Sequence, residues 1–332
     1  MARSGERVGG SKVSLSVHEQ RTILVVSHGH RADAIDAARH VIDSILAAGT
    51  GVALAELDRS ELGLHDRTDI ARLGIDVGVA DISLAIVLGG DGTILRAAEL
   101  VREGTAPVLG INMGHVGFLA EIERDDMADA LRRAIAGDYG VEERLALEVR
   151  VKDTSGDVIY ETWALNEVTV EKASRERMLE VVLEIDRLPL SSFGADGVVV
   201  STPTGSTAYN FSAGGPVIWP TVEAIAVVPL SAHALFARPL VVGPEASVAI
   251  EVLARTNGTG ILWADGRRSH DLPPGARVIV RRSARPVRLA RLHPAAFTDR
   301  LVRKFGLPVA GWRGPVEPAT GMLPVIALED DA

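Results

Sequence analysis

The chain has 332 residues, 47% of them apolar and 24% charged, so it is long enough for two domains that each bury a core. Its net charge of −9 argues against a general nucleic-acid binder, because neutralising phosphates needs an excess of Lys and Arg on one face. The lack of cysteine excludes disulfides, thiolate metal sites and a cysteine nucleophile, and it fits the reducing cytoplasm in which we expect the protein to act.

The N-terminal segment 1–20 lacks hydrophobic periodicity and combines Gly, Ser and charge, which predicts a disordered leader. It has no long apolar stretch, so it is not a secretory signal, and no run in the chain approaches the ~20 apolar residues of a membrane span. We therefore expect no membrane partner. A basic cluster at 281–291 alternates with apolar residues, and we interpret it as the wet faces of strands, with an anion site as the alternative.

The first half of the chain alternates strands with helices. The predicted elements are a strand at 22–27, a helix over 34–45, strands at 51–57 and 82–88, a helix over 93–102, a strand at 107–112 and a helix from 125 to about 137. The near-continuous apolar strands in this order predict a parallel sheet covered on both faces.

From about residue 145 the pattern changes to short, β-branched runs separated by turn residues. The predicted strands are 145–151, 158–163, 167–172, 179–185, 198–201, 240–253 and 276–282. We therefore predict a β-rich second domain over 143–296. In the tail, Leu301, Val302 and Phe305 have helical spacing, and we expect part of 297–332 to pack back on the first domain.

The stretch Gly89-Gly90-Asp91-Gly92-Thr93 directly follows one buried strand. Its glycines permit a tight turn and close approach to a ligand, and Thr93 is expected to cap the next helix. A turn from strand to helix suits phosphate oxygens. Asp91 has two interpretations: it accepts a proton or holds a cation beside phosphate, or Asp-Gly is only good turn chemistry.

The segment 196–216 places many hydroxyls, glycines and Tyr209 after a strand, and we interpret it as a ligand loop. The pair Asn166-Glu167 between two strand-like runs means little alone. The phosphate-binding patterns G-x-x-x-x-G-K-[ST] and G-x-G-x-x-G are missing. His28 and His30 are better explained as loop residues than as metal ligands, because no third ligand is spaced to join them.

Together these segments resemble the NAD kinase family, which is related to lipid kinases. Residues 89–93 match its GGDGT, and 110–119 (GINMGHVGFL) look like its GxNxGxxGFL. The pair 166–167 matches its NE, and 196–216 matches its DGxxxSTPTGSTAYxxSAGGP block, which is the most specific of the four. Order and spacing agree over roughly 20–313, and the tail looks like that of actinobacterial members.

This resemblance implies a Rossmann-like α/β domain over 21–142, a β-sandwich-like domain over 143–296, and NAD bound at their junction. The implied reaction transfers the γ-phosphate of ATP, with Mg²⁺, to the 2′-hydroxyl of the adenosine ribose of NAD and gives NADP. Polyphosphate is an alternative donor in actinobacterial relatives, and no residue here decides between the two donors.

The resemblance also implies roles for residues. Asp91 carries over as the proton acceptor, Gly92 lies beside the nucleotide, and Arg96 neutralises phosphate charge. The implied contacts to the dinucleotide are Asn166, Glu167, Arg177, Asp196, Thr207, Ala208, Tyr209, Asn210, Phe211 and Ser212. Gly89, Gly90 and Thr93 complete the phosphate loop. No protein ligands of the metal are identified, and substrate phosphates are expected to hold it.

Specificity and assembly are further expectations from the family. Gly194 falls where strictly NAD-preferring relatives tend to carry a charged residue, so our hypothesis is that NADH is also accepted. Relatives are commonly homodimers or homotetramers with a pocket completed by a neighbouring chain. Two competing functions remain. A lipid kinase should lack the STPTGSTAY block, and an NAD-sensing module without catalysis should lack Asp91.

Overall fold

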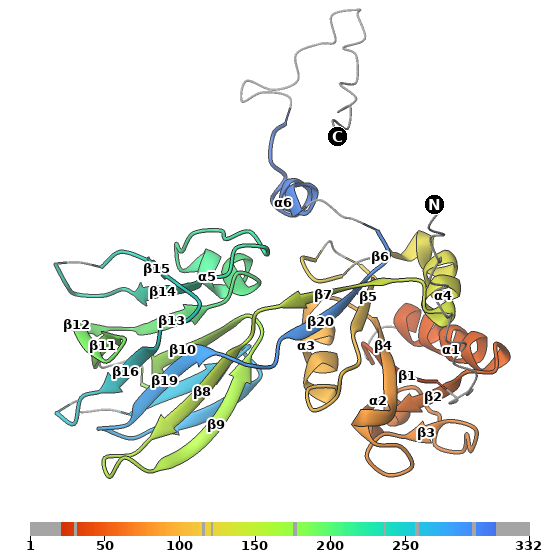
Figure 1. Cartoon of the computed structure of the whole chain (residues 1–332), viewed down its shortest axis with the longest axis horizontal. Helices are drawn as coiled ribbons and strands as arrows, with labels where there is room; N and C mark the ends of the chain where they lie inside the picture. Colours follow the sequence, from red (N-terminus) through yellow and green to blue (C-terminus); the bar gives the residue numbers. More distant parts are fainter. Residues whose placement is uncertain are drawn as a thin grey trace, which may run out of the picture.

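The computed structural model describes residues 21–29, 32–114, 117–120, 122–174, 178–235, 237–255, 259–293 and 297–309. Figure 1 shows an α/β lobe and a lobe made of strands, with helix α6 (Phe297–Phe305) above them. Two neighbouring antiparallel strands, β7 (Gly140–Arg144) and β20 (Val287–Arg291), connect the lobes. The predicted combination of an α/β domain with a β-rich domain is confirmed.

The sheet of the first lobe has eight strands, and β7 alone runs antiparallel to its neighbour among the described pairs. Its main path is, in spatial order, β3 (Ala71–Arg72), β2 (Gly51–Leu54), β1 (Thr22–Ser27), β4 (Ile82–Leu88), β5 (Val108–Asn112), β20 and β7, with β6 (Ile122–Glu123) paired to β5. β1 and β4 are buried at nearly every position, as continuous apolar runs predict for a covered parallel sheet.

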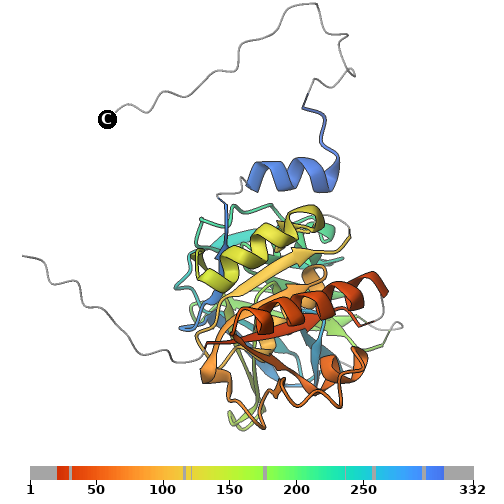
Figure 2. The ribbon, with the colours of Figure 1, turned by 90° about the vertical axis from the view of Figure 1, so that its right-hand side faces the viewer.

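Helices cover both faces of this sheet. They are α1 (Ala32–Ala47), α2 (Glu56–Glu61), α3 (Asp91–Leu100) and α4 (Met127–Ala136), and the 3-10 turns are η1 (Val79–Asp81) and η2 (Arg124–Asp126). α1 and α4 pack on the face that carries Ile23 and Val25, in front of the sheet in Figure 2. α3 packs on the opposite face with Leu24 and Val26.

The strand order reverses between β1 and β4. α1 connects β1 to β2 over one face, and α3 connects β4 to β5 over the other face. The N–H of His28 after β1 donates to the carbonyl of Leu88 in β4 at 3.1 Å, so the carboxyl ends of these strands are adjacent. Open α/β sheets bind ligands in the crevice at such a reversal, and the GGDGT turn lies there.

The second lobe is a β-sandwich with two six-stranded antiparallel sheets. One sheet has the order β15 (Leu240–Val242), β14 (Ile225–Leu230), β13 (Gly197–Ser201), β10 (Glu167–Lys172), β17 (Gly260–Ala264) and β18 (Arg268–Leu272). The other has the order β12 (Leu188–Ala195), β11 (Leu179–Ile185), β16 (Val248–Val252), β19 (Arg277–Arg282), β8 (Leu147–Lys152) and β9 (Val158–Ala164). Alternate residues such as Val168, Val170, Val278 and Val280 face the shared core.

The structure corrects the predicted assignment of three segments. β20 belongs to the first sheet, although the predicted boundary placed 287–291 in the β-rich domain. The predicted strand 240–253 is two strands in different sheets, because Gly243 to Ser247 form a turn between them. The end of the predicted strand 51–57 is the start of α2. Alternating apolar residues indicate a strand but do not indicate which sheet the strand joins, so local patterns could not assign these segments correctly.

Some predictions fall on residues outside the described ranges. These are the leader 1–20, Arg177, and the tail beyond residue 309. Within the part that is described, no helix combines the length and apolar character needed to cross a membrane.

Candidate active site

The turn after β4 places Asp91 at the start of α3. Gly90 precedes the helix with an extended backbone (φ −91°, ψ −171°), and the Thr93 N–H donates to the Gly90 carbonyl at 2.9 Å. The prediction that Thr93 caps the helix is therefore wrong, because a glycine cap lets α3 begin two residues earlier. The Thr93 side chain is instead buried against Gly89, where any Cβ would clash with it.

The Asp91 carboxylate is held by the backbone of the loop 117–119. Its Oδ2 accepts the N–H of Phe118 at 3.0 Å, and its Oδ1 accepts the N–H of Leu119 at 3.0 Å. Gly117 lies so close that a Cβ there would overlap Oδ1. Each carboxylate oxygen has a second lone pair, so this fixed and half-buried group can still accept a hydrogen bond from a substrate hydroxyl.

A cavity of ≈ 530 Å³ opens over the start of α3, a size in the range of small-molecule sites. Its walls are Ser27, His28, Gly29, Leu57, Glu61, Gly90, Gly92, Thr93, Arg96 and Arg267. Gly90 and Gly92 have open space where a Cβ would stand, so a ligand can approach the backbone there. The predicted phosphate loop thus borders a cavity.

Arg96 is on the cavity wall, and its guanidinium already binds protein groups. It donates to both carboxylate oxygens of Asp58, at 3.0 and 2.6 Å, and to the Ser27 carbonyl at 2.7 Å. Burial raises the pKa of Asp58 above its ordinary value, although hydrogen bonds from Arg96 and the Ser27 N–H oppose this. The Arg96 charge therefore compensates a buried acid, and its role toward phosphate stays a prediction.

Asn166 lies in a turn fixed from two sides. Its N–H donates to Oδ1 of Asp265 at 2.6 Å, and its carbonyl accepts the N–H of Thr202 at 2.9 Å. A Cβ on Gly205 would overlap that carbonyl, so the backbone of η3 (Gly205–Thr207) packs directly on the turn. The structure thus brings Asn166 together with the start of the STPTGSTAY segment.

Glu167, the first residue of β10, is buried and 7% exposed. Burial, and then the negative charge of Asp265, raise its pKa to about 8, against a hydrogen bond from the Tyr209 N–H. Its Oε2 has no hydrogen-bond partner among the described residues. A neutral carboxyl with one open oxygen can both donate and accept, which suits a hydroxyl or amide of a ligand.

The segment 202–212 divides into supporting and accessible residues. Asn210 is fully buried and donates to the carbonyls of Ser206 and Pro216 at 3.2 and 3.0 Å, so its amide supports the loop itself. Tyr209 and Phe211 in α5 (Tyr209–Ser212) are 40% and 43% exposed. Thr207 and Ala208 are half-buried, and Ser212 is exposed. These five residues are the part of the predicted ligand loop that a ligand can reach.

Asp196 lies away from the Asn166 turn within this chain. Its Oδ1 is 2.5 Å from Nζ of Lys172, the last residue of β10, whereas Glu167 is the first. At ~3.3 Å per residue the two ends of β10 are roughly 16 Å apart. The Lys172 ammonium holds the pKa of Asp196 below its ordinary value. The predicted contacts therefore form two groups in one chain.

Helix α6 joins loops of the two lobes. Phe305 stacks on Phe211 with ring centroids 4.4 Å apart, and Phe297 meets Trp219 edge-on at 4.9 Å. Both α6 rings also contact Phe118, and Arg300 donates to the Phe118 carbonyl at 2.6 Å. The tail thus contacts the first lobe, where part of it was expected to pack, and also the second lobe, and it reaches the loop that holds Asp91.

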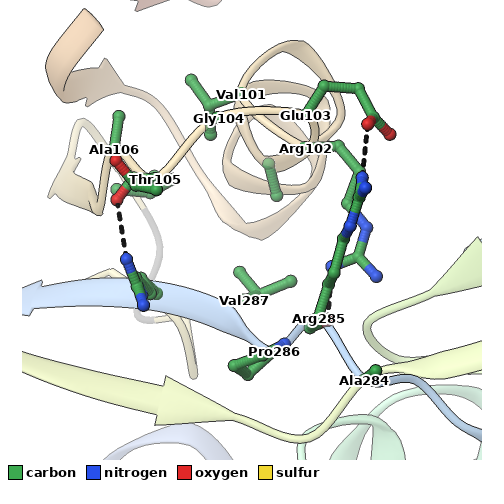
Figure 3. A pocket seen from close by; sticks show the side chains of 13 residues that line it. Val101, Arg102, Glu103, Gly104, Thr105, Ala106, Ala284, Arg285, Pro286 and Val287 are labelled. Carbon is green, nitrogen blue, oxygen red and sulfur yellow. Dashed lines mark hydrogen bonds and ion pairs between the residues drawn. The ribbon is translucent and has the colours of Figure 1, made fainter. Parts of the chain in front are cut away.

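Another cavity, of ≈ 330 Å³, lies at the opposite end of α3 between residues 101–108 and 284–288. Figure 3 shows Arg285 paired with Glu103 at its rim, and Arg102 beside them. Unlike the cavity over Gly90 and Gly92, this cavity has no residue of the GGDGT turn in its wall. We therefore assign no chemistry of the reaction to it.

The sequence reasoning missed Asp265 and Arg267 on the turn between β17 and β18, and Arg268 at the start of β18. Asp265 holds the Asn166 turn, and Arg267 reaches the cavity over Gly90. The only available signal was the Asp265-Gly266 pair, which is typical of a tight hairpin turn. Both residues have positive φ, 53° and 63°.

The metal was predicted to be held by substrate phosphates. The described residues contain no group of three or more His, Asp or Glu side chains that could hold a metal ion. Asp91 is the carboxylate at the turn beside the cavity, and Mg²⁺ typically takes one or two carboxylates plus phosphate oxygens and water. This donor set fits a metal that arrives with a phosphorylated substrate.

The fold and the site define a two-domain nucleotide phosphotransferase with its carboxylate at the crevice of the α/β lobe. The sequence matches the ATP-NAD kinase N-terminal domain over residues 23–139 and the ATP-NAD kinase C-terminal domain over 165–292. It is 62% identical over 298 residues to an NAD kinase of Leifsonia xyli subsp. xyli, which covers 89% of this chain and 98% of that protein. The chain therefore belongs to the ATP-NAD kinase family, whose function is the phosphorylation of NAD to NADP.

Solved structures share the fold. The crystal structure of yeast NADH kinase complexed with NADH matches with a TM-score of 0.78 at 22% identity, over 87% of this chain and 88% of that one. An NAD kinase from Archaeoglobus fulgidus in complex with ATP matches with a TM-score of 0.62 at 24% identity, over 86% and 97%. At these identities the likeness supports the architecture of both lobes.

Gly205→Ala tests the contact between η3 and the Asn166 turn. The added Cβ would overlap the Asn166 carbonyl, so we expect the free energy of unfolding to fall by about 1–3 kcal/mol and the KM for NAD to rise. Urea denaturation and NADP formation measure the two effects. Gly243→Ala is the control, because its Cβ meets no atom within 4 Å. Equal behaviour of both variants would contradict the packing argument.

Glu167→Gln tests the buried carboxyl through stability. The pKa is raised from 4.5 in the unfolded chain to about 8 in the folded one, so the folded state holds more protons between these values. Wild-type stability should therefore fall as pH rises from 4.5 to 8, by up to ~1.4 kcal/mol per unit, relative to the Gln variant. Urea denaturation from pH 5 to 9 measures this difference. The control is Glu161→Gln, at an exposed carboxylate, and matching curves for wild type and Glu167→Gln would refute the shift.

Proposed function

We propose that this chain transfers the γ-phosphate of ATP to the 2′-hydroxyl of the adenosine ribose of NAD, with Asp91 as the general base. The observation that carries the proposal is the Asp91 carboxylate at the first turn of α3, fixed by two backbone N–H groups beside a cavity. Family membership supplies the reaction. A carboxylate held in place at this position needs no reorganisation before it receives the hydroxyl proton.

In the proposed step the 2′-hydroxyl proton passes to Asp91 while the ribose oxygen attacks the γ-phosphorus. The bond from the γ-phosphorus to the bridging oxygen breaks, and ADP leaves. The N-terminus of α3 and the backbone at Gly90 and Gly92 favour negative charge there. Arg267 on the cavity wall adds a guanidinium from the second lobe. Phosphoryl transfer asks mainly for positioning and charge neutralisation, which these groups offer.

ATP is the proposed donor because the Archaeoglobus NAD kinase of the same fold was solved with ATP. Mg²⁺ is proposed to enter with the phosphates, where it neutralises charge on the transferred group. Polyphosphate carries the same terminal phosphoryl group, so replacing ATP by polyphosphate in the assay decides whether it is a second donor. A cytoplasmic location remains part of the proposal and rests on the cysteine-free composition.

NAD is proposed to lie between the Asn166-Glu167 turn and the accessible residues 207–212. Glu167 would meet a polar group of the dinucleotide through its open Oε2, and the exposed Tyr209 ring offers a stacking face. Arg177 and Asn210 remain in the proposal from the family pattern alone. Buried Asn210 would act by shaping the loop.

We further propose that the protein is a homodimer or homotetramer. Asp196 lies at the far end of β10 from Glu167, so a neighbouring copy is the natural source of a second contact group. Two of the edge strands of the sandwich, β12 and β15, also expose apolar side chains, with Leu188 71%, Leu190 49% and Val241 54% exposed. Exposed apolar edge strands tend to pair with another chain, which is consistent with a subunit interface at these strands.

Asp91→Asn tests the general base. We expect kcat to fall by about 10²–10⁴ with NAD binding retained, because an amide cannot take the proton. NADP formation with ATP and Mg²⁺ measures kcat, and calorimetry measures the Kd for NAD. The melting temperature is followed as well, since an Asn side chain turns an NH₂ group toward one of the two N–H donors. Near-normal turnover in this variant would sink the assignment.

The hypothesis on NADH predicts that the wild-type protein phosphorylates NADH as well as NAD. We propose that a carboxylate at position 194 would lie close enough to the nicotinamide to favour NAD, whose ring is positively charged, over NADH, whose ring is neutral. Gly194→Glu is therefore expected to lower kcat/KM for NADH relative to NAD by about tenfold. Gly243→Glu is the control in open space. A wild-type protein that leaves NADH unphosphorylated removes the hypothesis.

A further inference from the structure

Glu99 attaches α3 to the second lobe. It follows Asp91 by eight residues on the same helix, roughly 12 Å along the axis at ~1.5 Å per residue. The Arg267 Nε donates to both of its oxygens at 3.2 Å, and the Arg268 Nε lies 3.0 Å from Oε1. The latter N–H is not aligned for a hydrogen bond, so charge attraction joins Arg268 to Glu99. The helix that begins with Asp91 is thus bound to the β17–β18 turn.

Arg268 is itself held in one orientation. Its Nη2 donates to Oδ2 of Asp265 at 2.9 Å, and its Nη1 donates to the Thr162 hydroxyl at 3.0 Å. Its Cζ lies 4.7 Å from the centre of the Trp163 ring. A planar guanidinium with carboxylate, hydroxyl and aromatic partners has little freedom to turn, so Arg268 transmits position as well as charge.

Asp265 carries the contact on to the NAD-binding turn. Its side chain is 1% exposed, and its oxygens accept the N–H groups of Asn166 at 2.6 Å and Leu165 at 3.0 Å. Its own N–H donates to the Glu167 carbonyl at 2.9 Å. The backbone of Asp265 is left-handed, with φ 53°, as is usual for the first residue of an Asp-Gly hairpin turn. Asp265 therefore sets the backbone of both members of the Asn166-Glu167 pair.

We propose that Glu99, Arg268 and Asp265, together called the α3 brace, are positioning residues that fix the Asn166-Glu167 turn relative to Asp91. None of the three is assigned a contact with substrate. The brace crosses from the first lobe to the second and links the helix of the proton acceptor to the turn that is proposed to hold the ribose. It rests on the proposed roles of Asp91 and Asn166-Glu167.

A second attachment keeps the far end of α3 in register with the brace. Arg102, just after the helix, donates to the carbonyl of Arg285 and the hydroxyl of Ser283, both at 2.7 Å. Figure 3 shows Arg102 and Arg285 side by side at this junction. The Arg102 guanidinium also lies 4.4 Å from the centre of the Trp163 ring, which Arg268 contacts too. Movement of α3 along its axis would break both attachments, so the helix has one defined position against the sandwich.

The test uses Glu99→Gln, Asp265→Asn and the double variant in the full-length protein. Glu99→Gln leaves the Asn166 turn intact and removes the charge that binds it to α3, so kcat should fall about tenfold while the KM for NAD stays near the wild-type value. Asp265→Asn removes one of two acceptors for the turn, so the KM for NAD should rise by about tenfold as well. Because Glu99 and Asp265 belong to one continuous series of contacts, removing both should cost less in kcat/KM than the product of the two single losses.

Glu245→Gln is the matched control, since its side chain is 88% exposed and belongs to a surface ion pair of the sandwich. Melting temperature and circular dichroism normalise each rate to folded protein, so a purely structural role would lower stability and leave kcat and KM per folded molecule unchanged. That result, or single losses that simply multiply, would overturn the brace. If Asp265→Asn does not fold, Glu99→Gln alone decides through kcat. Full activity of Asp91→Asn would instead reject the proposed function and leave the coupling measurement standing.

Discussion

The antiparallel pairing of β7 with β20 is the constraint on which the rest of the structure depends. The chain leaves the first sheet along β7 and returns along β20, which also pairs in parallel with β5, so the whole sandwich is attached to one edge of the α/β sheet. The sandwich then covers the α3 face, where Ala146 and Leu165 join the core of the first lobe. This places the Asn166 turn beside α3, the helix that begins with Asp91, although the two residues are 75 positions apart in the sequence.

Local sequence patterns correctly predicted those elements whose structure depends mainly on neighbouring residues. β1 and β4 were predicted to the residue, because continuous apolar runs bounded by polar residues and glycines describe a covered parallel strand. The turn at Gly89 and the GGDGT match located Asp91. Thr93 was misjudged as a cap because Thr is a frequent cap, whereas here packing against Gly89 determines its place.

Contacts between distant segments could not be predicted in this way. β20 reads as an ordinary alternating strand, and only its partners place it in the first sheet. Asp265 reads as turn chemistry, and its two bonds to the Asn166 turn depend on the β10–β17 register, which pairs Val168 with Ala264. The separation of Asp196 from Glu167 likewise follows from their places at opposite ends of one strand. A match to family motifs assigns Asp196 and Glu167 to the same kind of site, but it does not show whether both come from one copy of the protein or from two.

Buried acids give this site its electrostatic character. Burial raises the pKa of Asp58 and of Asp265, and each has an arginine partner, Arg96 and Arg268. Glu167 has Asp265 nearby and no cationic partner among the described residues, so it remains neutral near pH 7. Leaving a buried polar oxygen open costs free energy of folding, which bound substrate can recover by pairing with it. Asp58 and Asp265 are therefore paired with arginines and stabilise the fold, whereas Glu167 is a neutral carboxyl with one oxygen that a ligand can bind.

Helix α6 is a further link between the lobes. None of its residues is buried, and its contacts include four ring contacts and the bond from Arg300. Ring pairs are worth about 0.5–1.5 kcal/mol each, and exposure reduces this. The relative position of Asp91 and the Asn166 turn is therefore set by β7, β20 and the Glu99 contacts.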